Sequence, residues 1–380
     1  LTMGPIHRAL YKTLAIEPGK RLFVEGASTG TGYDCLRSAL SSSCRALGMV
    51  SSDSRGERVE AVGGHAINRK DDRWSDIFTS VPDDPSQWGA WEAAGEAFVA
   101  EAEALAGGQI DYSVSHAGET AFPRSFQLLG ENGVLTFYGA SSGYRFTFMG
   151  KSGATTPAVQ FSKAGLRAGQ SLLVVYGPGA EDGIVDPVAI EAIEVGCQRG
   201  AQVAVLVDTV SQREFVSSLG FGTQMKGAVS IEEIERRLGD DFDPPGPFQK
   251  MPNPFTESAA FKESVRAFSD RTLKPIGSAI APLLRNTLDK RGLPDVVFER
   301  AGRDGLALAT SLVKPNVGKV VYSEDLKGAR FSFYAPQVWM RQRRILMPTA
   351  EIRGTHLNTS REFAEMQERI AAGHINILPP

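Results

Sequence analysis

Short apolar runs that predict strands alternate along the chain with longer stretches that predict helices. In the first part of the chain the predicted strands are Arg21–Glu25, Gly48–Ser52, His65–Asn68, Tyr112–Ser115 and Gly133–Tyr138. Later ones are predicted at Ser171–Tyr176, Gln202–Val207, Asp295–Glu299, Lys319–Tyr322 and Ile352–His356. Helices are predicted at Glu92–Leu105 and Arg361–Ala371. This alternation favours an α/β fold in which helices cover both faces of a parallel sheet.

Three segments of the first part are echoed in the same order further along, which indicates an internal duplication. Residues 15–26 resemble residues 166–177, residues 110–118 resemble 294–302, and residues 143–148 resemble 328–333. The spacing between matched positions grows, so we place the extra residues of the second copy in Asp243–Phe255 and the helix after it. The chain is therefore predicted to hold two tandem doubly wound domains, 1–150 and 151–360, followed by a closing helix and tail, 361–380.

Bulk properties exclude several classes of function. The 380 residues carry a formal net charge of −3, which gives no electrostatic case for nucleic acid or an anionic membrane. No apolar run approaches the ~20 residues that span a bilayer. The 3 cysteines and 5 histidines show no metal-type spacing, so no metal is predicted, and a reducing, cytoplasmic location is favoured. The first residues do not resemble the start of a complete domain, and we expect a piece of a longer protein.

A glycine-dense turn follows the first predicted strand and leads into a helix. Such a turn leaves backbone amides free at the positive end of a helix, which suits a diphosphate. Gly26 lets the strand turn, Gly30 allows close approach of a diphosphate, and Gly32 lets the helix pack near the strand. The alternative is a tight turn that holds no ligand. The residues predicted to hold the diphosphate are Gly26, Ala27, Ser28, Thr29, Gly30, Thr31 and Gly32.

The end of the second predicted strand favours NADPH over NADH. Ser52, Ser54 and Arg55 are suited to a 2′-phosphate, and Arg69 is a further candidate near the adenosine. Asp53 argues the other way, because an acid at this place takes the ribose hydroxyls of NADH. A solvated helix start is the alternative, since Ser and Asp are also favoured N-caps.

The second copy departs from this pattern. Pro178 removes a backbone donor from its turn, and Glu181 and Asp182 place negative charge where a diphosphate would lie. We predict a degenerate copy without a nucleotide, although an adenosine-containing ligand held by Asp208 stays open.

Four segments resemble the cofactor lobe of medium-chain dehydrogenases/reductases: Gly26–Gly32, Gly139–Tyr144, Val338–Arg341 and Arg353–Asn358. The most similar branch is that of crotonyl-CoA carboxylase/reductases and acrylyl-CoA reductases. In that branch the second and third segments are contiguous, whereas here the whole second copy separates them. This arrangement resembles the reductase portion of propionyl-CoA synthases, which are multifunctional fusion enzymes.

The resemblance implies NADPH-dependent reduction of an enoyl-CoA, acrylyl-CoA to propionyl-CoA, by one part of a larger multidomain enzyme. It implies that Gly139, Ala140 and Ser141 lie at the nicotinamide end. His116 matches a position that helps to bind carbon dioxide in carboxylating relatives, although the family's Glu-His-Pro-Gly is altered here to Ser115–Gly118. A strand-end histidine bonded to backbone is the alternative for His116, and no catalytic residue is assigned.

Arg341, Arg343 and Arg344 follow Trp339 on a predicted helix and are candidates for the phosphates of an acyl-CoA substrate. A solvated helix face is the alternative. Dimers of the superfamily often join their sheets edge to edge, so the two copies are expected to do this within one chain, and a homo-oligomer is also compatible. The rival functions are an NADPH-dependent quinone or alkenal reductase and a non-catalytic Rossmann-like scaffold.

Overall fold

The computed structural model describes residues 3–28, 30–176, 186–246, 248–285, 289–300 and 305–373. Its strands are β1 (Arg21–Val24), β2 (Arg45–Val50), β3 (His65–Asn68), β4 (Ile110–Ser115), β5 (Leu129–Phe137), β6 (Arg145–Met149), β7 (Ser171–Tyr176), β8 (Gln202–Val207), β9 (Met225–Ser230), β10 (Val296–Arg300), β11 (Lys319–Val321), β12 (Arg330–Tyr334), β13 (Arg344–Leu346) and β14 (Ala350–Gly354).

Helices connect most of these strands. The α-helices are α1 (Met3–His7), α2 (Gly30–Ser41), α3 (Asp53–Glu60), α4 (Trp88–Ala106), α5 (Phe122–Gln127), α6 (Pro157–Ala164), α7 (Pro187–Gln198), α8 (Val210–Ser218), α9 (Ile231–Leu238), α10 (Ser258–Ala267), α11 (Lys274–Leu284), α12 (Leu306–Leu312), α13 (Ala335–Trp339) and α14 (Ser360–Ala371). Other helical turns are η1 (Arg8–Leu14), η2 (Pro85–Gln87), η3 (Gly222–Gln224), η4 (Gly239–Asp241) and η5 (Phe268–Leu273).

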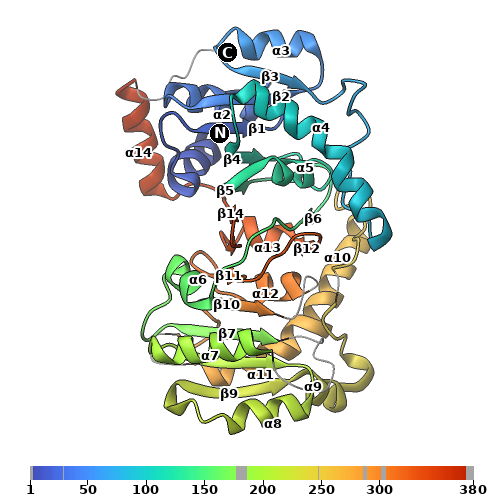
Figure 1. Cartoon of the computed structure of the whole chain (residues 1–380), viewed down its shortest axis with the longest axis vertical. Helices are drawn as coiled ribbons and strands as arrows, with labels where there is room; N and C mark the ends of the chain where they lie inside the picture. Colours follow the sequence, from blue (N-terminus) through green and yellow to red (C-terminus); the bar gives the residue numbers. More distant parts are fainter. Residues whose placement is uncertain are drawn as a thin grey trace.

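Twelve of the described strands form one sheet that runs the length of the molecule (Figure 1). Its order is β3-β2-β1-β4-β5-β14-β13-β11-β10-β7-β8-β9. We call the first six strands of this order the first unit and the other six the second unit. Read outward from the centre, the two units have the same arrangement, with a central strand at which the order of connection reverses. The fold is therefore α/β with a large, mostly parallel sheet, while descent of the units from a duplication stays a prediction.

The units join through β13 and β14, which pair antiparallel with Ile345 opposite Ile352. The chain reaches β14 only after it has built the second unit, and β14 then pairs in parallel with β5. A strand within the predicted range 151–360 thus completes the sheet of the first unit. The edge-to-edge joining expected of the two copies is present within this one chain.

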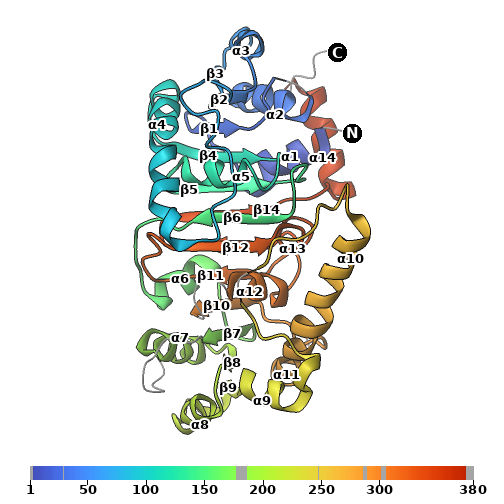
Figure 2. The ribbon, with the colours of Figure 1, turned by 90° about the vertical axis from the view of Figure 1, so that its right-hand side faces the viewer.

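A ribbon of two strands, β6 and β12, crosses the junction (Figure 2). Phe148 lies opposite Phe331 and Phe146 opposite Phe333 in this antiparallel pair. The rings of Phe148 and Phe331 stack with their centroids 4.9 Å apart. All four phenylalanines are fully buried, in one apolar cluster that also contains residues of α5, α11, α12 and α13. Buried aromatic area on this scale is a main source of stability at the junction. The sequence repeat at 143–148 and 328–333 thus corresponds to paired strands.

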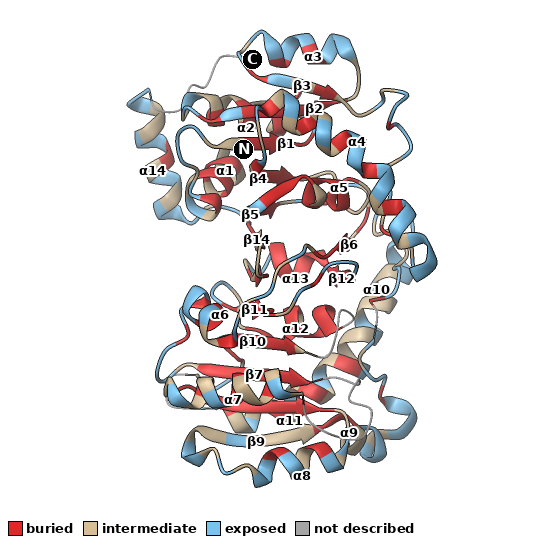
Figure 3. Ribbon diagram, viewed as in Figure 1, coloured by how far each residue is buried: buried red, intermediate tan, exposed pale blue. Residues whose placement is uncertain are grey.

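Helices cover both faces of each unit, as the alternating pattern predicts. In the first unit, α1, η1 and α2 pack on one face and α4 on the other. In the second unit, α6 and α7 cover one face, while α11 and α12 belong to the cluster on the opposite face. The sheet is buried along most of its length, with exposed residues on the outer sides of the helices (Figure 3).

The closing helix α14 lies against the start of the chain. Lys12 and Glu365 form an ion pair at 2.6 Å, and Arg8 pairs with Glu362. The guanidinium of Arg369 lies over the ring of Tyr11. In the part of the chain that the structure describes, no helix has the length and apolar character needed to cross a bilayer. The tail after residue 373 lies outside the described residues.

Candidate functional site

The glycine turn after β1 has the geometry expected of a ligand-holding bend. Gly26 and Gly30 adopt positive φ angles of 56° and 51°, a region that favours glycine. A Cβ on Gly32 would lie 2.7 Å from the carbonyl oxygen of Glu25, so α2 can pack this closely only with glycine there. By contrast, a Cβ on Gly30 would meet no atom within 4 Å. The turn is therefore packed on its inner side and open at Gly30. Thr29 lies outside the described residues.

The side chains of the other residues in the turn pack against the protein. Ala27 is fully buried, and a Cβ on Gly48 of β2 would lie 2.5 Å from the Ala27 Cβ. The Ala27 amide donates to the carbonyl of Met49 at 3.0 Å, which fixes the turn to β2. Ser28 is buried and Thr31 is half-buried. These residues shape the turn, and any contact of Ala27 with a ligand would be through its backbone.

A buried carboxylate that the sequence analysis did not single out anchors the turn. Glu25 is fully buried and accepts hydrogen bonds from the backbone amides of His116 at 3.0 Å and Ala117 at 2.9 Å. The hydroxyl of Ser125 donates to its second oxygen. Glu25 thus ties the end of β1 to the end of β4 and to α5. The sequence did contain a sign of this role. Glu25 directly follows the apolar residues of β1, and an acid buried at such a place needs hydrogen-bond partners.

His116 lies beside the turn, at the end of β4. Its Cε1 and Nε2 atoms would each lie 3.1 Å from a Cβ on Gly26, and its ring stacks on that of Tyr138 at 5.9 Å. Its Nδ1 and the Tyr138 hydroxyl are buried without a hydrogen-bond partner among the described residues. Burial raises the pKa of Tyr138 well above its ordinary value. The imidazole is therefore held by packing, with no hydrogen bond from Nδ1 to the backbone.

The loop after β5 lies against the loop after β4. Gly139 adopts a φ angle of 74°, Ala140 is buried and Ser141 is exposed. The Ser141 hydroxyl donates to the carbonyl of Ala117 at 3.0 Å, and the Ser142 amide donates to the same oxygen at 2.9 Å. These bonds bring the predicted nicotinamide-end residues to the sheet edge where His116 lies.

Polar side chains gather at the end of β2 and the start of α3. The hydroxyls of Ser52 and Ser54 are 3.1 Å apart, and the exposed Arg55 donates to the Ser51 hydroxyl at 2.7 Å. Asp53, the acid that argues for NADH rather than NADPH, accepts a hydrogen bond from Asn68 at 2.9 Å.

Arg69 follows β3 and is half-buried, with its amide bonded to Val50 at 2.9 Å. The serines, Arg55 and Arg69 thus all follow the carboxyl ends of adjacent strands, as the glycine turn does.

The three arginines predicted to bind CoA phosphates do not form a cluster on a helix. Helix α13 ends at Trp339, before any of them. Arg343 is buried and donates to the carbonyls of Gln337 and Ser311 at 3.1 and 3.2 Å, and burial lowers its pKa to about 9. Arg344, on β13, pairs with Glu351. These two guanidinium groups therefore stabilise the fold. Of the three arginines, Arg341 is the one that is exposed at the surface.

The same edge of the second unit carries acidic groups. Arg300 bonds Asp186, the N-cap of α7, at 2.6 Å through its Nε, and it also pairs with Glu324. Asp208 follows β8, and burial raises its pKa to about 6. Asp186 and Glu324 are paired with Arg300, so Asp208 is the carboxylate of this edge that would repel a diphosphate. Pro178, Glu181 and Asp182 lie outside the described residues.

Metal chemistry finds no support in the described residues. No group of three or more His, Cys, Asp or Glu side chains among them is arranged to hold a metal ion. Cys35 and Cys44 are buried, and Cys197 is half-buried. Burial raises the pKa of all three thiols, which disfavours a reactive thiolate.

No protein-family model matches the chain. The chain is similar to a crotonyl-CoA carboxylase/reductase from Cereibacter sphaeroides, with 24% identity over 161 residues, which is 39% of this chain and 35% of that relative. A solved crotonyl-CoA carboxylase/reductase matches with 26% identity and a TM-score of 0.36, covering 39% of this chain and 35% of the other. The structure of crotonyl-CoA carboxylase/reductase AntE in complex with NADP matches with 22% identity and a TM-score of 0.35, covering 38% and 36%. The aligned part thus spans about a third of the length of each.

Proposed function

We propose that the first unit binds NADPH, with the diphosphate at the turn between β1 and α2. The observation that carries this proposal is the contrast between the two glycines. A Cβ on Gly32 would lie 2.7 Å from the carbonyl oxygen of Glu25, whereas a Cβ on Gly30 would meet no atom within 4 Å. A bend that is tightly packed inside and open outside lets a ligand approach the free amides at the start of α2. The curated relative described above is a reductase, and the serines and Arg55 that follow β2 favour NADPH as the reductant.

The residues at the carboxyl edge fit the parts of this cofactor. Ser52, Ser54 and Arg55 offer hydroxyl and guanidinium donors for the 2′-phosphate, and Arg69 lies at the adjacent strand end. The loop Gly139–Ser141 would lie at the nicotinamide end, beside His116. The domain that holds the cofactor would comprise residues 1–150 together with β14.

We infer that the reaction is reduction of an enoyl-CoA, of which acrylyl-CoA is the smallest. NADPH supplies a hydride for the β-carbon of such a substrate. The chain's own task is to hold both reactants and exclude water at the carboxyl edge. The chain would act as the cofactor-binding part of a larger enzyme that supplies a separate substrate lobe. Similarity to a carboxylase/reductase that acts on crotonyl-CoA supports this reaction class, and the order of the motifs favours a fusion enzyme of the propionyl-CoA synthase type.

Replacing Arg55 by alanine tests the choice between NADPH and NADH. A charge-assisted hydrogen bond contributes about 1.5–3 kcal/mol, so the affinity for NADPH is expected to fall roughly 10- to 150-fold. The affinity for NADH, which lacks the 2′-phosphate, is expected to stay the same. Fluorescence titration of the reduced nicotinamide measures both constants.

Arg45→Ala is the matched control, because Arg45 is an exposed arginine at the start of β2, whereas Arg55 lies in α3, which follows the end of β2. It should leave both affinities unchanged. Equal losses of NADPH and NADH binding in Arg55→Ala, or no binding of either coenzyme by the unaltered chain, would contradict the proposal.

A further inference from the structure

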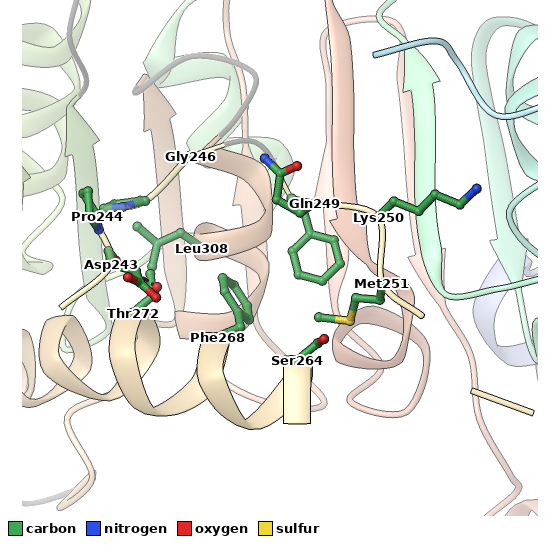
Figure 4. Close-up of a pocket in the computed structure, with 12 residues that line it drawn as sticks. Asp243, Pro244, Gly246, Gln249, Lys250, Met251, Ser264, Phe268, Thr272 and Leu308 are labelled. Carbon is green, nitrogen blue, oxygen red and sulfur yellow. Dashed lines mark hydrogen bonds between the residues drawn. The ribbon is translucent and has the colours of Figure 1, made fainter. Parts of the chain in front are cut away.

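Two cavities share no lining residue with the glycine turn, and they differ in what they offer a ligand. One, of about 380 Å³, lies between the Pro-rich segment that begins at Asp243, α10, η5 and α12. Figure 4 shows Phe268 and Leu308 directed toward its space, while the ammonium group of Lys250 points away from them. The hydroxyl of Ser264, at its border, donates to a backbone carbonyl of its own helix. This cavity therefore offers a ligand mainly apolar surface.

The other cavity, of about 590 Å³, lies at the edge of the sheet opposite to the glycine turn. In its lining, Gln109 and Thr349 directly precede β4 and β14, and Gly130 lies at the start of β5. Residues of α4 and of the loop after β6 complete the wall. These three strands run parallel, so their amino ends meet here, away from the carboxyl ends that carry the proposed cofactor residues. The volume suits a small molecule.

The lining of this second cavity includes a half-buried lysine, Lys151. Its ammonium group donates to the backbone carbonyl of Gln127 at 3.1 Å and lies 5.7 Å from the centre of the buried Phe126 ring. Among the described residues no carboxylate forms an ion pair with it. Glu103 and Glu92, in the same lining, attract it only over a longer distance. An ammonium group held against an aromatic ring without an ion-pair partner is costly to keep charged.

The amine of Lys151 is therefore partly uncharged near neutral pH. Burial lowers its pKa to about 8, and the two glutamates offset this only in part. At pH 7.5 about a quarter of such amines carry no charge, compared with about one in a thousand for a lysine at the ordinary pKa of about 10.4. The uncharged amine is the nucleophilic form, and lysines desolvated in this way form imines with carbonyl compounds.

We propose that Lys151 captures a small neutral aldehyde in this cavity as an imine. The amine nitrogen attacks the carbonyl carbon, so that an N–C bond forms while the C=O double bond opens. The oxygen then leaves as water with the two amine protons, and the N–C bond becomes double, with no oxidation or reduction. Glu103 and Glu131 in the lining disfavour an anionic carbonyl compound such as a 2-oxo acid. The inference does not depend on the proposed reductase function.

Propanal is the probe, applied to the whole chain together with sodium cyanoborohydride, which reduces an imine to a stable amine. Peptide mass spectrometry then measures the N-propyl group on each lysine. At pH 7.5, Lys151 is expected to react at least about tenfold faster than Lys262, an exposed lysine of α10. This ratio should shrink toward pH 10, where ordinary lysines also lose their proton. A ratio near one at pH 7.5 would overturn the proposal.

Glyoxylate, an aldehyde that carries a carboxylate, tests the selection against anions. Its ratio of Lys151 to Lys262 labelling is expected to be severalfold smaller than that of propanal. Glu103→Gln should bring the two ratios closer, because it removes a negative charge from the cavity lining. Glu101→Gln, on the same helix but facing Arg73 at 3.8 Å, is the matched control and should leave both ratios unchanged. Equal ratios for the two aldehydes in the unaltered chain would overturn the assignment of a neutral ligand.

Two arginine variants verify which lysine reacts. Lys151→Arg keeps the positive charge but cannot form the imine, so the fast-reacting site should disappear while a thermal melt shows the fold retained. Lys327→Arg exchanges an exposed lysine in the lining of the same cavity, and it should leave the labelling of Lys151 unchanged. A fast-reacting site that persists in Lys151→Arg would contradict the proposal.

The outcomes are separate from those of the proposed function. The Arg55 titrations report on the carboxyl edge of the sheet, whereas the labelling reports on the amino edge. Fast labelling of Lys151 in a protein that binds no NADPH would uphold the imine site and contradict the reductase. Slow labelling in a protein that binds NADPH would do the reverse.

Discussion

Gly30→Asp is expected to weaken NADPH binding about a hundredfold, because the new carboxylate would stand near the diphosphate at low effective dielectric. The substitution is chosen to spare the fold. Aspartate tolerates a positive φ better than most residues, a Cβ at Gly30 meets no atom within 4 Å, and an acid at the first residue of α2 interacts favourably with the helix dipole. Fluorescence titration gives the affinity, and a thermal melt verifies the fold.

Gly19→Asp is the matched control, since Gly19 lies before β1 with a φ angle of 80° and open space around it. It adds the same charge and backbone strain to the same unit, away from the turn between β1 and α2, and should leave the affinity for NADPH unchanged. An unaltered affinity in Gly30→Asp would show that the diphosphate does not lie at this turn.

Glu25→Ala is expected to lower the free energy of unfolding by about 3–5 kcal/mol, the largest loss of stability that we predict. The exchange leaves the amides of His116 and Ala117 and the hydroxyl of Ser125 buried without their acceptor, and it opens a void between β1 and α5. Denaturant unfolding measures the loss, and hydrogen exchange should locate the increased opening at the amides of His116 and Ala117.

Glu17→Ala, an exchange of an exposed acid shortly before β1, serves as the control and should change stability by less than about 0.5 kcal/mol. Glu25→Gln keeps one acceptor oxygen and should fall between the two. A loss in Glu25→Ala no larger than in the control would mean that the carboxylate does not anchor the strand ends.

Three strands could be predicted to the residue. β3, β7 and β8 begin and end where the sequence predicts, because a glycine lies one or two residues before each of them and marks the preceding turn. β9 was not predicted, since it is an edge strand that contains a lysine and a glycine within its first three residues. β13 is only three residues long and carries no periodic signal.

The position of the candidate site was predictable to the extent that it depends on backbone conformation, while its role in binding stays a prediction. The glycines of the turn and the serines after β2 lie at one edge of the sheet, as the order of strands and turns implied. The roles of Glu25 and Arg343 were not predictable, because they depend on partners distant in the sequence. Glu25 is bonded to residues about 90 and 100 positions away, and Arg343 reaches Ser311. A charged residue in a sequence gives no sign of whether solvent or such a partner will satisfy it.

The antiparallel pairing of β13 with β14 makes the contact between the units intramolecular. Two separate subunits joined in this way would come apart on dilution, whereas here the connecting residues keep the partner edge at a fixed local concentration. The pairing should therefore persist at any protein concentration. It also means that the two units need not be identical. In a homodimer each substitution appears in both subunits, but here the second unit can carry acids such as Asp186 and Asp208 after its strands while the first unit keeps its glycine turn.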